Sequence, residues 1–165
     1  MSYTFSRRSF LKYTAVAAVA AAGSTLLAGC EVQDPYNPSS KKLGSSLTIS
    51  DVTGKLLDKS NGTDLQQGVF KMEIKSSYGN RITVNAANFN LTVKGSDGTV
   101  KKAYYANLNY DSTVGTLEKG ESASVTLTAP NYPEVVAGDV VTFQYIPVLG
   151  STGSSYSMVW EITVE

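Results

Sequence analysis

The stretch that decides the fold is FKMEIK, residues Phe70 to Lys75, in which apolar and charged side chains alternate strictly. Because successive side chains of a strand point to opposite faces, this alternation predicts a β-strand with one buried and one solvated face. The two-residue period recurs at 89–94, 122–127, 141–145 and 158–164, whereas no later segment carries a 3.6-residue apolar stripe. The sequence therefore predicts an all-β domain.

Turn signals separate these alternating runs. Asp97-Gly98 lies between the run at 89–94 and the return strand expected at 100–105, and Asp-Gly favours a hairpin because both residues tolerate positive φ. Pro147 ends the strand before it or places that strand at an edge. Residues 108–117 are less regular, and we expect a loop or a short helix there. Seven or eight short strands, each with one polar face, predict an antiparallel β-sandwich.

Several of these features together resemble a known family. They are Phe89-x-Leu91, the Asp97-Gly98 turn, the segment LEKGES at 117–122 that leads into a strand, and a late strand ending near Pro147. They resemble the telokin-like, immunoglobulin-fold domain of unknown function that occurs in bacterial lipoproteins. The resemblance covers residues 47–165 and implies an immunoglobulin-like β-sandwich at the cell surface, without the Cys…Trp…Cys pattern of antibody domains. It implies no catalytic residue, because the family has no catalytic motif to match.

The N-terminal region predicts export. Arg7 and Arg8 are followed by Phe10, Leu11 and Lys12, which matches the twin-arginine pattern at every position. The mostly apolar run at 13–28 has about 16 residues and is shorter than the about 20 that span a bilayer. A positive start and a short apolar run are typical of a cleavable signal peptide, here residues 1–29; a membrane-anchoring or buried helix is the alternative.

The apolar run ends in a candidate lipid-attachment site. Leu27-Ala28-Gly29-Cys30 resembles the bacterial lipobox, in which cleavage precedes the cysteine and the thiol receives diacylglycerol; Cys30 is the only cysteine of the chain. Acyl chains, at ~0.8 kcal/mol per buried CH₂, would hold the protein durably on a membrane. We therefore predict a lipoprotein on the extracytoplasmic face of the cell membrane, or in the outer membrane of a diderm host. Residues 30–46, with two prolines and several serines, would form a flexible tether to the sandwich at 47–165.

Composition excludes several functions. Residues 1–29 carry three basic and no acidic side chains, so the chain from Cys30 onward has eleven basic and fourteen acidic side chains and a formal charge of −3. Nucleic acid is therefore not an expected partner, because phosphate binding needs clustered Lys and Arg. The chain contains no histidine, which removes Ser-His-Asp catalysis and imidazole metal sites. With Cys30 acylated, thiolate chemistry is removed as well, and we expect no cofactor and no enzymatic activity.

Two groups of acidic residues suggest a catalytic pair or a calcium site, and each also fits an ordinary turn. The carboxylate pairs Glu118/Glu121 and Glu134/Asp139 could serve as acid and base, but both pairs lie in expected turns, where solvated carboxylates are ordinary. Asp58 and Asp64 place oxygen donors as calcium loops do, yet the pattern is not an EF-hand. Because the intervening Asn-Gly suits a turn, we favour a turn over a calcium site.

Tyrosine is the remaining candidate for recognition. The chain has ten tyrosines, and five of them lie at expected strand ends or in loops, where they can stack on sugars or anchor a protein: Tyr104, Tyr105, Tyr110, Tyr132 and Tyr156. Tyr145 and Trp160 are expected in the core instead. The sequence thus favours a lipid-anchored module that binds or supports a protein or glycan partner in the envelope. A carbohydrate- or small-ligand-binding lipoprotein and a calcium-stabilised structural domain are the alternatives.

Overall fold

The computed structural model describes residues 42–149, 152–153 and 157–165. The predicted signal and lipidation residues, Arg7 to Lys12 and Leu27 to Cys30, lie outside the described residues, as does Tyr156. Within the described part, regular structure consists of β-strands and two short 3-10 turns, η1 (Lys59–Asn61) and η2 (Ala86–Asn88). None of the helices found there is long and apolar enough to cross a membrane.

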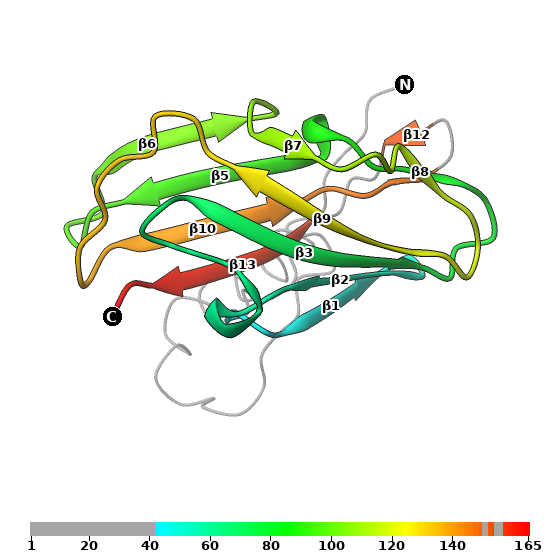
Figure 1. The fold of residues 1–165 in the computed structure, drawn as a ribbon, viewed down its shortest axis with the longest axis horizontal. Helices are drawn as coiled ribbons and strands as arrows, with labels where there is room; N and C mark the ends of the chain where they lie inside the picture. The colour runs from blue at the N-terminus through cyan, green and yellow to red at the C-terminus, as the bar shows by residue number, and fades with distance from the viewer. Residues whose placement is uncertain (1–41, 150–151, 154–156) are drawn as a thin grey trace, which may run out of the picture. The chain divides into compact units, whose positions relative to one another are not determined.

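Two large antiparallel sheets form the layers of a β-sandwich (Figure 1). The first has the order β1-β2-β3-β9-β7, and the second has the order β13-β10-β5-β6. The strands of the first sheet are β1 (Ser46–Ile49), β2 (Val52–Leu56), β3 (Val69–Ser76), β7 (Asn109–Asp111) and β9 (Ser122–Thr128). Those of the second are β5 (Phe89–Lys94), β6 (Val100–Tyr105), β10 (Val140–Tyr145) and β13 (Met158–Thr163).

A third, small sheet of two-residue strands has the order β12-β11-β4-β8. Its members are β4 (Ile82–Thr83), β8 (Thr116–Leu117), β11 (Val148–Leu149) and β12 (Thr152–Gly153). The segment 108–117 thus contains the strands β7 and β8, so the expectation of a loop or a short helix there is wrong. Three and two residues are too few for a two-residue period to be recognised; pairing with β9 and β4 fixes these strands instead.

The core forms from the apolar positions that alternate along the strands. In β3, Phe70, Met72 and Ile74 are fully buried, and the charged residues between them face outward. Phe70 stacks on Phe143 of β10 with ring centroids 5.3 Å apart, so the two sheets meet through their inner faces. Tyr145 and Trp160 are buried in the same cluster, which confirms their prediction as core residues. The predicted β-sandwich is confirmed.

The fold begins before the predicted start of the sandwich. The Gly44 N–H donates to the Leu56 carbonyl at 2.8 Å, and the Trp160 indole N–H donates to the Ser45 carbonyl at 3.0 Å. Leu43 also packs against the core. Residues 42–46, which the sequence analysis assigned to the tether, therefore belong to the folded structure, because backbone groups there take part in the fold.

Candidate binding surface

Exposed apolar side chains gather around one strand. Among the described residues, the exposed large hydrophobic side chains are Val100, Tyr105 and Val136, with 53%, 71% and 51% of their surface accessible. Val100 and Tyr105 are the first and last residues of β6, and Val136 belongs to the segment that leads into β10. Single exposed apolar residues are common on protein surfaces; here two of the three belong to one strand, and the third belongs to the segment that the Lys101 side chain contacts.

β6 is an edge strand, and half of its backbone groups face outward. In the described structure it pairs only with β5. The Gly95 N–H donates to the Thr99 carbonyl at 2.8 Å, and the Ala106 N–H donates to the Phe89 carbonyl at 3.3 Å. Hydrogen-bonded and non-bonded residue pairs alternate along an antiparallel ladder. Both bonds therefore identify the same residues of β6 as the ones whose backbone groups face away from β5. The N–H and C=O groups of Ala103 and Tyr105 therefore point away from β5. We refer to Val100, Lys102, Ala103, Tyr105 and the adjacent Val136 as the β6 edge.

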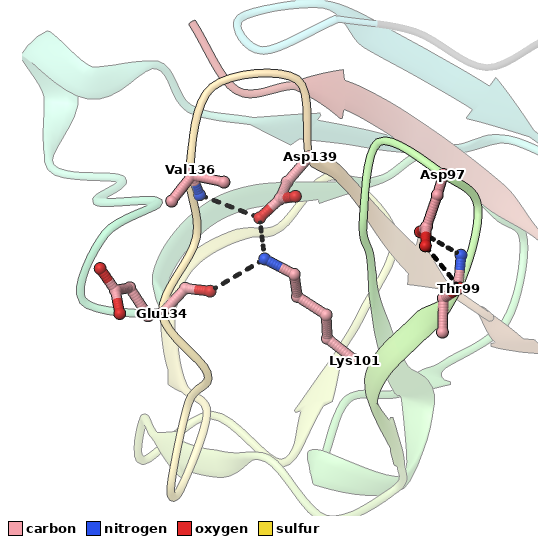
Figure 2. Close-up of polar contacts among 6 residues, drawn as sticks. All are labelled: Asp97, Thr99, Lys101, Glu134, Val136 and Asp139. Atoms are coloured by element: carbon pink, nitrogen blue, oxygen red, sulfur yellow. Dashed lines mark hydrogen bonds and ion pairs between the residues drawn. The ribbon is translucent and has the colours of Figure 1, made fainter.

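A β-bulge redirects Lys101. Val93 lies opposite Lys102 and Lys94 lies opposite Val100, so Lys101 is an extra residue without a partner in β5. A bulge changes the direction of the side chain that it carries. Figure 2 shows the result: the Lys101 amine reaches Asp139 Oδ2 at 2.5 Å and the Glu134 carbonyl at 3.3 Å. The bulge thereby ties β6 to the segment that carries Val136.

The Lys101–Asp139 ion pair has a buried and a partly open side. The side chain of Asp139 is 2% exposed, and that of Lys101 is 31% exposed. Asp139 Oδ2 also accepts the Val136 N–H at 2.9 Å. The hydrogen bond from Lys101 is the main cause that holds the pKa of Asp139 below its usual value; the Val136 N–H adds to it, and burial opposes both. Asp139 is therefore a charged structural group that fixes the loop beside β6.

The predicted hairpin turn lies beside this ion pair, at the start of β6. The Asp97 carboxylate accepts the Thr99 N–H at 2.8 Å and the Thr99 hydroxyl at 2.9 Å (Figure 2). These bonds lower the pKa of Asp97, and Gly98 adopts φ of 83°, which favours glycine. The prediction of a hairpin between residues 89–94 and 100–105 is confirmed.

The structure separates the predicted tyrosines. Tyr105 is exposed, whereas Tyr104 is 1% exposed and its hydroxyl donates to the Asn131 carbonyl at 3.2 Å. Tyr110 is half-buried, stacks on Phe89 and donates to the Val114 carbonyl at 2.6 Å. Tyr132 is half-buried with its hydroxyl enclosed. The prediction that Tyr104 is a contact residue is wrong, because Tyr104 faces the core opposite Leu91; Tyr110 and Tyr132 pack inward as well.

Asp58 and Asp64 act as turn-forming residues. Asp58 Oδ1 accepts from the Ser60 hydroxyl at 2.7 Å and from the Asn61 backbone at 3.1 Å, and it caps η1. Asp64 Oδ1 accepts from the backbone N–H groups of Gln66 and Gln67. These bonds engage Oδ1 of each carboxylate within its own turn, and the described residues contain no cluster of three or more acidic, His or Cys side chains suited to a metal. The turn that the sequence favoured is present.

The Glu118/Glu121 pair closes a turn, and the groove beside β13 is lined without tyrosine. Glu121 Oε2 accepts the Glu118 N–H at 2.8 Å, so this pair closes the turn before β9. A groove of about 620 Å³ lies beside the end of β13. Its lining contains no aromatic residue: Lys42, Leu43, Asp58, Lys59, Ser60, Leu65, Glu161, Ile162, Thr163 and Glu165. The clustered aromatics that carbohydrate binding predicts are thus not at this groove.

Comparison with known proteins supports export. The twin-arginine translocation (TAT) pathway signal sequence matches residues 4–24. The chain carries a twin-arginine signal. This match confirms the signal predicted at Arg7, Arg8 and the residues that follow, and it implies export across the cytoplasmic membrane. A search of curated proteins finds no match.

Solved structures offer distant similarities. A candidate lipoprotein of Bacillus subtilis subsp. subtilis str. 168, ycdA, is 13% identical with a TM-score of 0.42, over 76% of this chain and 39% of that one. The yjhA protein of Bacillus subtilis is 13% identical with a TM-score of 0.44, and the match covers 76% of this chain and 99% of that one. A chain of the archaellum periplasmic stator complex FlaF and FlaG of Sulfolobus acidocaldarius is 11% identical with a TM-score of 0.41. The match covers 75% of this chain and 98% of that one. At these TM-scores, none carries an inference about this chain.

Sequence reasoning missed most of the β6 edge. It selected Tyr105 but not Val100, Lys102, Ala103 or Val136. The segment VKKAYY at 100–105 does not alternate, so its pattern does not show which side chains point outward. The bulge at Lys101 is defined by the pairing of β6 with β5, so the segment alone carries no signal for it.

Proposed function

We propose that this protein is an exported lipoprotein whose immunoglobulin-like β-sandwich binds a partner in the cell envelope and catalyses no reaction. The twin-arginine signal at residues 4–24 supports the export step, and Cys30 follows that match by six residues at the end of the apolar run. Acylation of Cys30 would keep the sandwich at the extracytoplasmic face of a membrane.

The observation that carries the binding role is the position of Val100, Tyr105 and Val136. Val100 and Tyr105 lie at the two ends of an edge strand whose outward-facing backbone groups are unpaired within the described residues, and Val136 lies in the segment that Lys101 ties to that strand. Exposed apolar surface and free strand edges are liabilities that soluble proteins generally cover or blunt, and their combination favours a protein-binding surface. The absence of histidine and the structural roles of Asp139 and Glu121 favour binding over catalysis.

Membrane anchoring is tested by mass spectrometry and fractionation. In the wild-type protein purified from membranes, we expect the N-terminal residue to be Cys30 with diacylglycerol on its thiol. Cys30→Ala should lose the lipid and leave the membrane fraction after export, and replacing both Arg7 and Arg8 by Lys should stop export. A Cys30→Ala variant that stays membrane-bound to the wild-type extent would refute lipid anchoring.

Partner binding is tested by photo-crosslinking in intact cells. A photoreactive phenylalanine analogue at position 105 should crosslink to an envelope component. The same analogue at Thr48, an exposed position in the edge strand β1 of the other sheet, is the matched control. Crosslinks at position 105 alone are expected. Equal yields at both positions, or none at position 105, would contradict binding through the β6 edge.

A further inference from the structure

We propose that β6 binds an extended acidic segment of its partner as an additional strand of the β13-β10-β5-β6 sheet. This inference rests on the proposed binding function and specifies its geometry and chemistry. It follows from three properties of β6: its free backbone groups, its exposed side chains and its charge.

The backbone of β6 is ready to accept a strand. The N–H and C=O groups of Ala103 and Tyr105 point away from β5, as the phase of the ladder requires. The nearby segment at 131–136 contacts β6 through the side chains of Lys101 and Tyr104, and no backbone hydrogen bond joins it to the strand in the described structure. In Figure 1, β6 lies at the outer border of its sheet. A partner strand can therefore form main-chain hydrogen bonds there without displacing any seen in the structure.

The side chains of β6 set the composition of that strand. Tyr105 is exposed on the outer face of the sheet, and Val100 is exposed at the start of the strand. Lys102 has the same parity as the buried Tyr104, yet Lys102 is exposed. The side chains of an added strand would therefore lie beside Tyr105 on one face and beside Lys102 on the other. Because side chains alternate along a strand, the added segment should alternate apolar residues, which face Tyr105, with acidic residues, which face Lys102.

Charge favours an acidic partner over a second copy of this chain. β6 contains two lysines and no acidic residue, and Asp139 pairs with Lys101 only. Asp97 bonds within its own hairpin, and the Glu134 carboxylate points away from Lys101 in Figure 2. Lys102 therefore has no ion pair in the described structure. Pairing with another β6 would bring the unpaired Lys102 of both copies into one short ladder, whereas glutamates opposite Lys102 would be attracted.

The test uses the full-length lipoprotein in detergent and a fluorescent peptide, acetyl-EVEVEVE-amide, followed by anisotropy. We expect saturable binding that weakens with added salt, and no comparable binding of acetyl-KVKVKVK-amide. A glutamate–valine peptide with N-methyl groups on alternate amides should bind about tenfold more weakly, because it cannot donate along one edge. Equal affinity for the methylated peptide would overturn strand addition.

Two variants locate the site. Ala103→Pro removes an outward N–H and leaves the bonds of β5 in place, so it should weaken binding about tenfold. Lys102→Glu changes only an exposed side chain and should shift the preference toward the lysine peptide, which keeps the test valid if the proline variant does not fold. Lys75→Glu in β3 of the other sheet is the matched charge control, because Lys75 is exposed and lies opposite uncharged Thr53 and Ser122; the affinity of this variant should stay within about twofold of wild type. Equal effects of Lys102→Glu and Lys75→Glu would overturn the assignment to β6.

The outcomes separate the inference from the proposed function. Crosslinking at position 105 without peptide binding would leave the envelope-binding role intact and refute the strand-addition mode. Loss of both would refute both. A concentration-dependent dimer that Ala103→Pro abolishes would show that a second copy occupies β6 and would overturn the acidic partner.

Discussion

The close contact between Gly68 and Tyr132 allows a quantitative test of the packing under strand β3. Gly68 has φ of +65°, and a Cβ added there would lie 2.5 Å from Cγ of the Tyr132 ring. Gly68→Ala therefore costs ~1–2 kcal/mol for the left-handed backbone. Displacing the ring, which also packs edge-on against Phe70, adds ~1–3 kcal/mol of overpacking. We expect a total loss of roughly 2–5 kcal/mol, or a Tm lowered by roughly 8–20 °C for a domain of this size.

A double-mutant cycle separates the two contributions. In a Tyr132→Ala background the ring is gone, so Gly68→Ala should cost only the backbone strain of ~1–2 kcal/mol. Urea unfolding followed by the fluorescence of Trp160, the single and fully buried tryptophan, gives each free energy. A coupling energy of about 1–3 kcal/mol is expected. If Gly68→Ala costs the same in both backgrounds within about 0.5 kcal/mol, the ring does not lie against Gly68 and the reasoning is refuted.

Further predictions concern the core and the dependence of stability on pH. Phe143→Ala removes a ring that stacks on Phe70 and contacts Trp160, and it should lower the free energy of unfolding by about 3–5 kcal/mol. Phe143→Leu should lower it by less than about 1.5 kcal/mol. Equal losses for the two variants in urea titrations would contradict a tightly packed site. Because the pKa of Asp139 is lowered in the folded state, this carboxylate stabilises the fold above its usual pKa near 4, and that stabilisation is lost as the pH falls below it. Asp139→Asn should therefore flatten the acid side of a Tm-against-pH curve. An unchanged slope would argue against the ion pair with Lys101. Burial raises the pKa of Tyr145, so the folded state disfavours the ionised phenol and stability should fall as the pH rises above about 10. Tyr145→Phe should reduce this loss of stability at alkaline pH. A wild-type slope in that variant would contradict the burial of the phenol.

Local sequence pattern predicted the strands whose faces differ in polarity. Phe70 to Lys75 alternates, and its apolar side chains fill the core because the strand has one solvated face. Asp97-Gly98 likewise predicted its hairpin, since the turn depends on residues within the turn itself. The export signal was equally accessible, because a receptor reads it as a linear motif.

The candidate binding surface depends on contacts between distant parts of the chain. Whether Tyr104 or Tyr105 points outward is decided by the register between β5 and β6, which the local pattern does not contain. Asp139 is expected in a solvated turn, yet it is buried because Lys101, 38 residues earlier, reaches it from the bulge. Neighbours in space thus decided the features that sequence reasoning missed.

The hydrogen bond from Trp160 to the Ser45 carbonyl has a consequence for biosynthesis. It joins residues 115 positions apart, and β1 and β13 also lie near each other in the fold. A nascent chain that has not yet produced β13 lacks this bond, and β10 then has one unpaired side that exposes an apolar strand. Since distant contacts form slowly, we expect the sandwich to close only after β13 has emerged. Truncations within β13 should accordingly give aggregated protein.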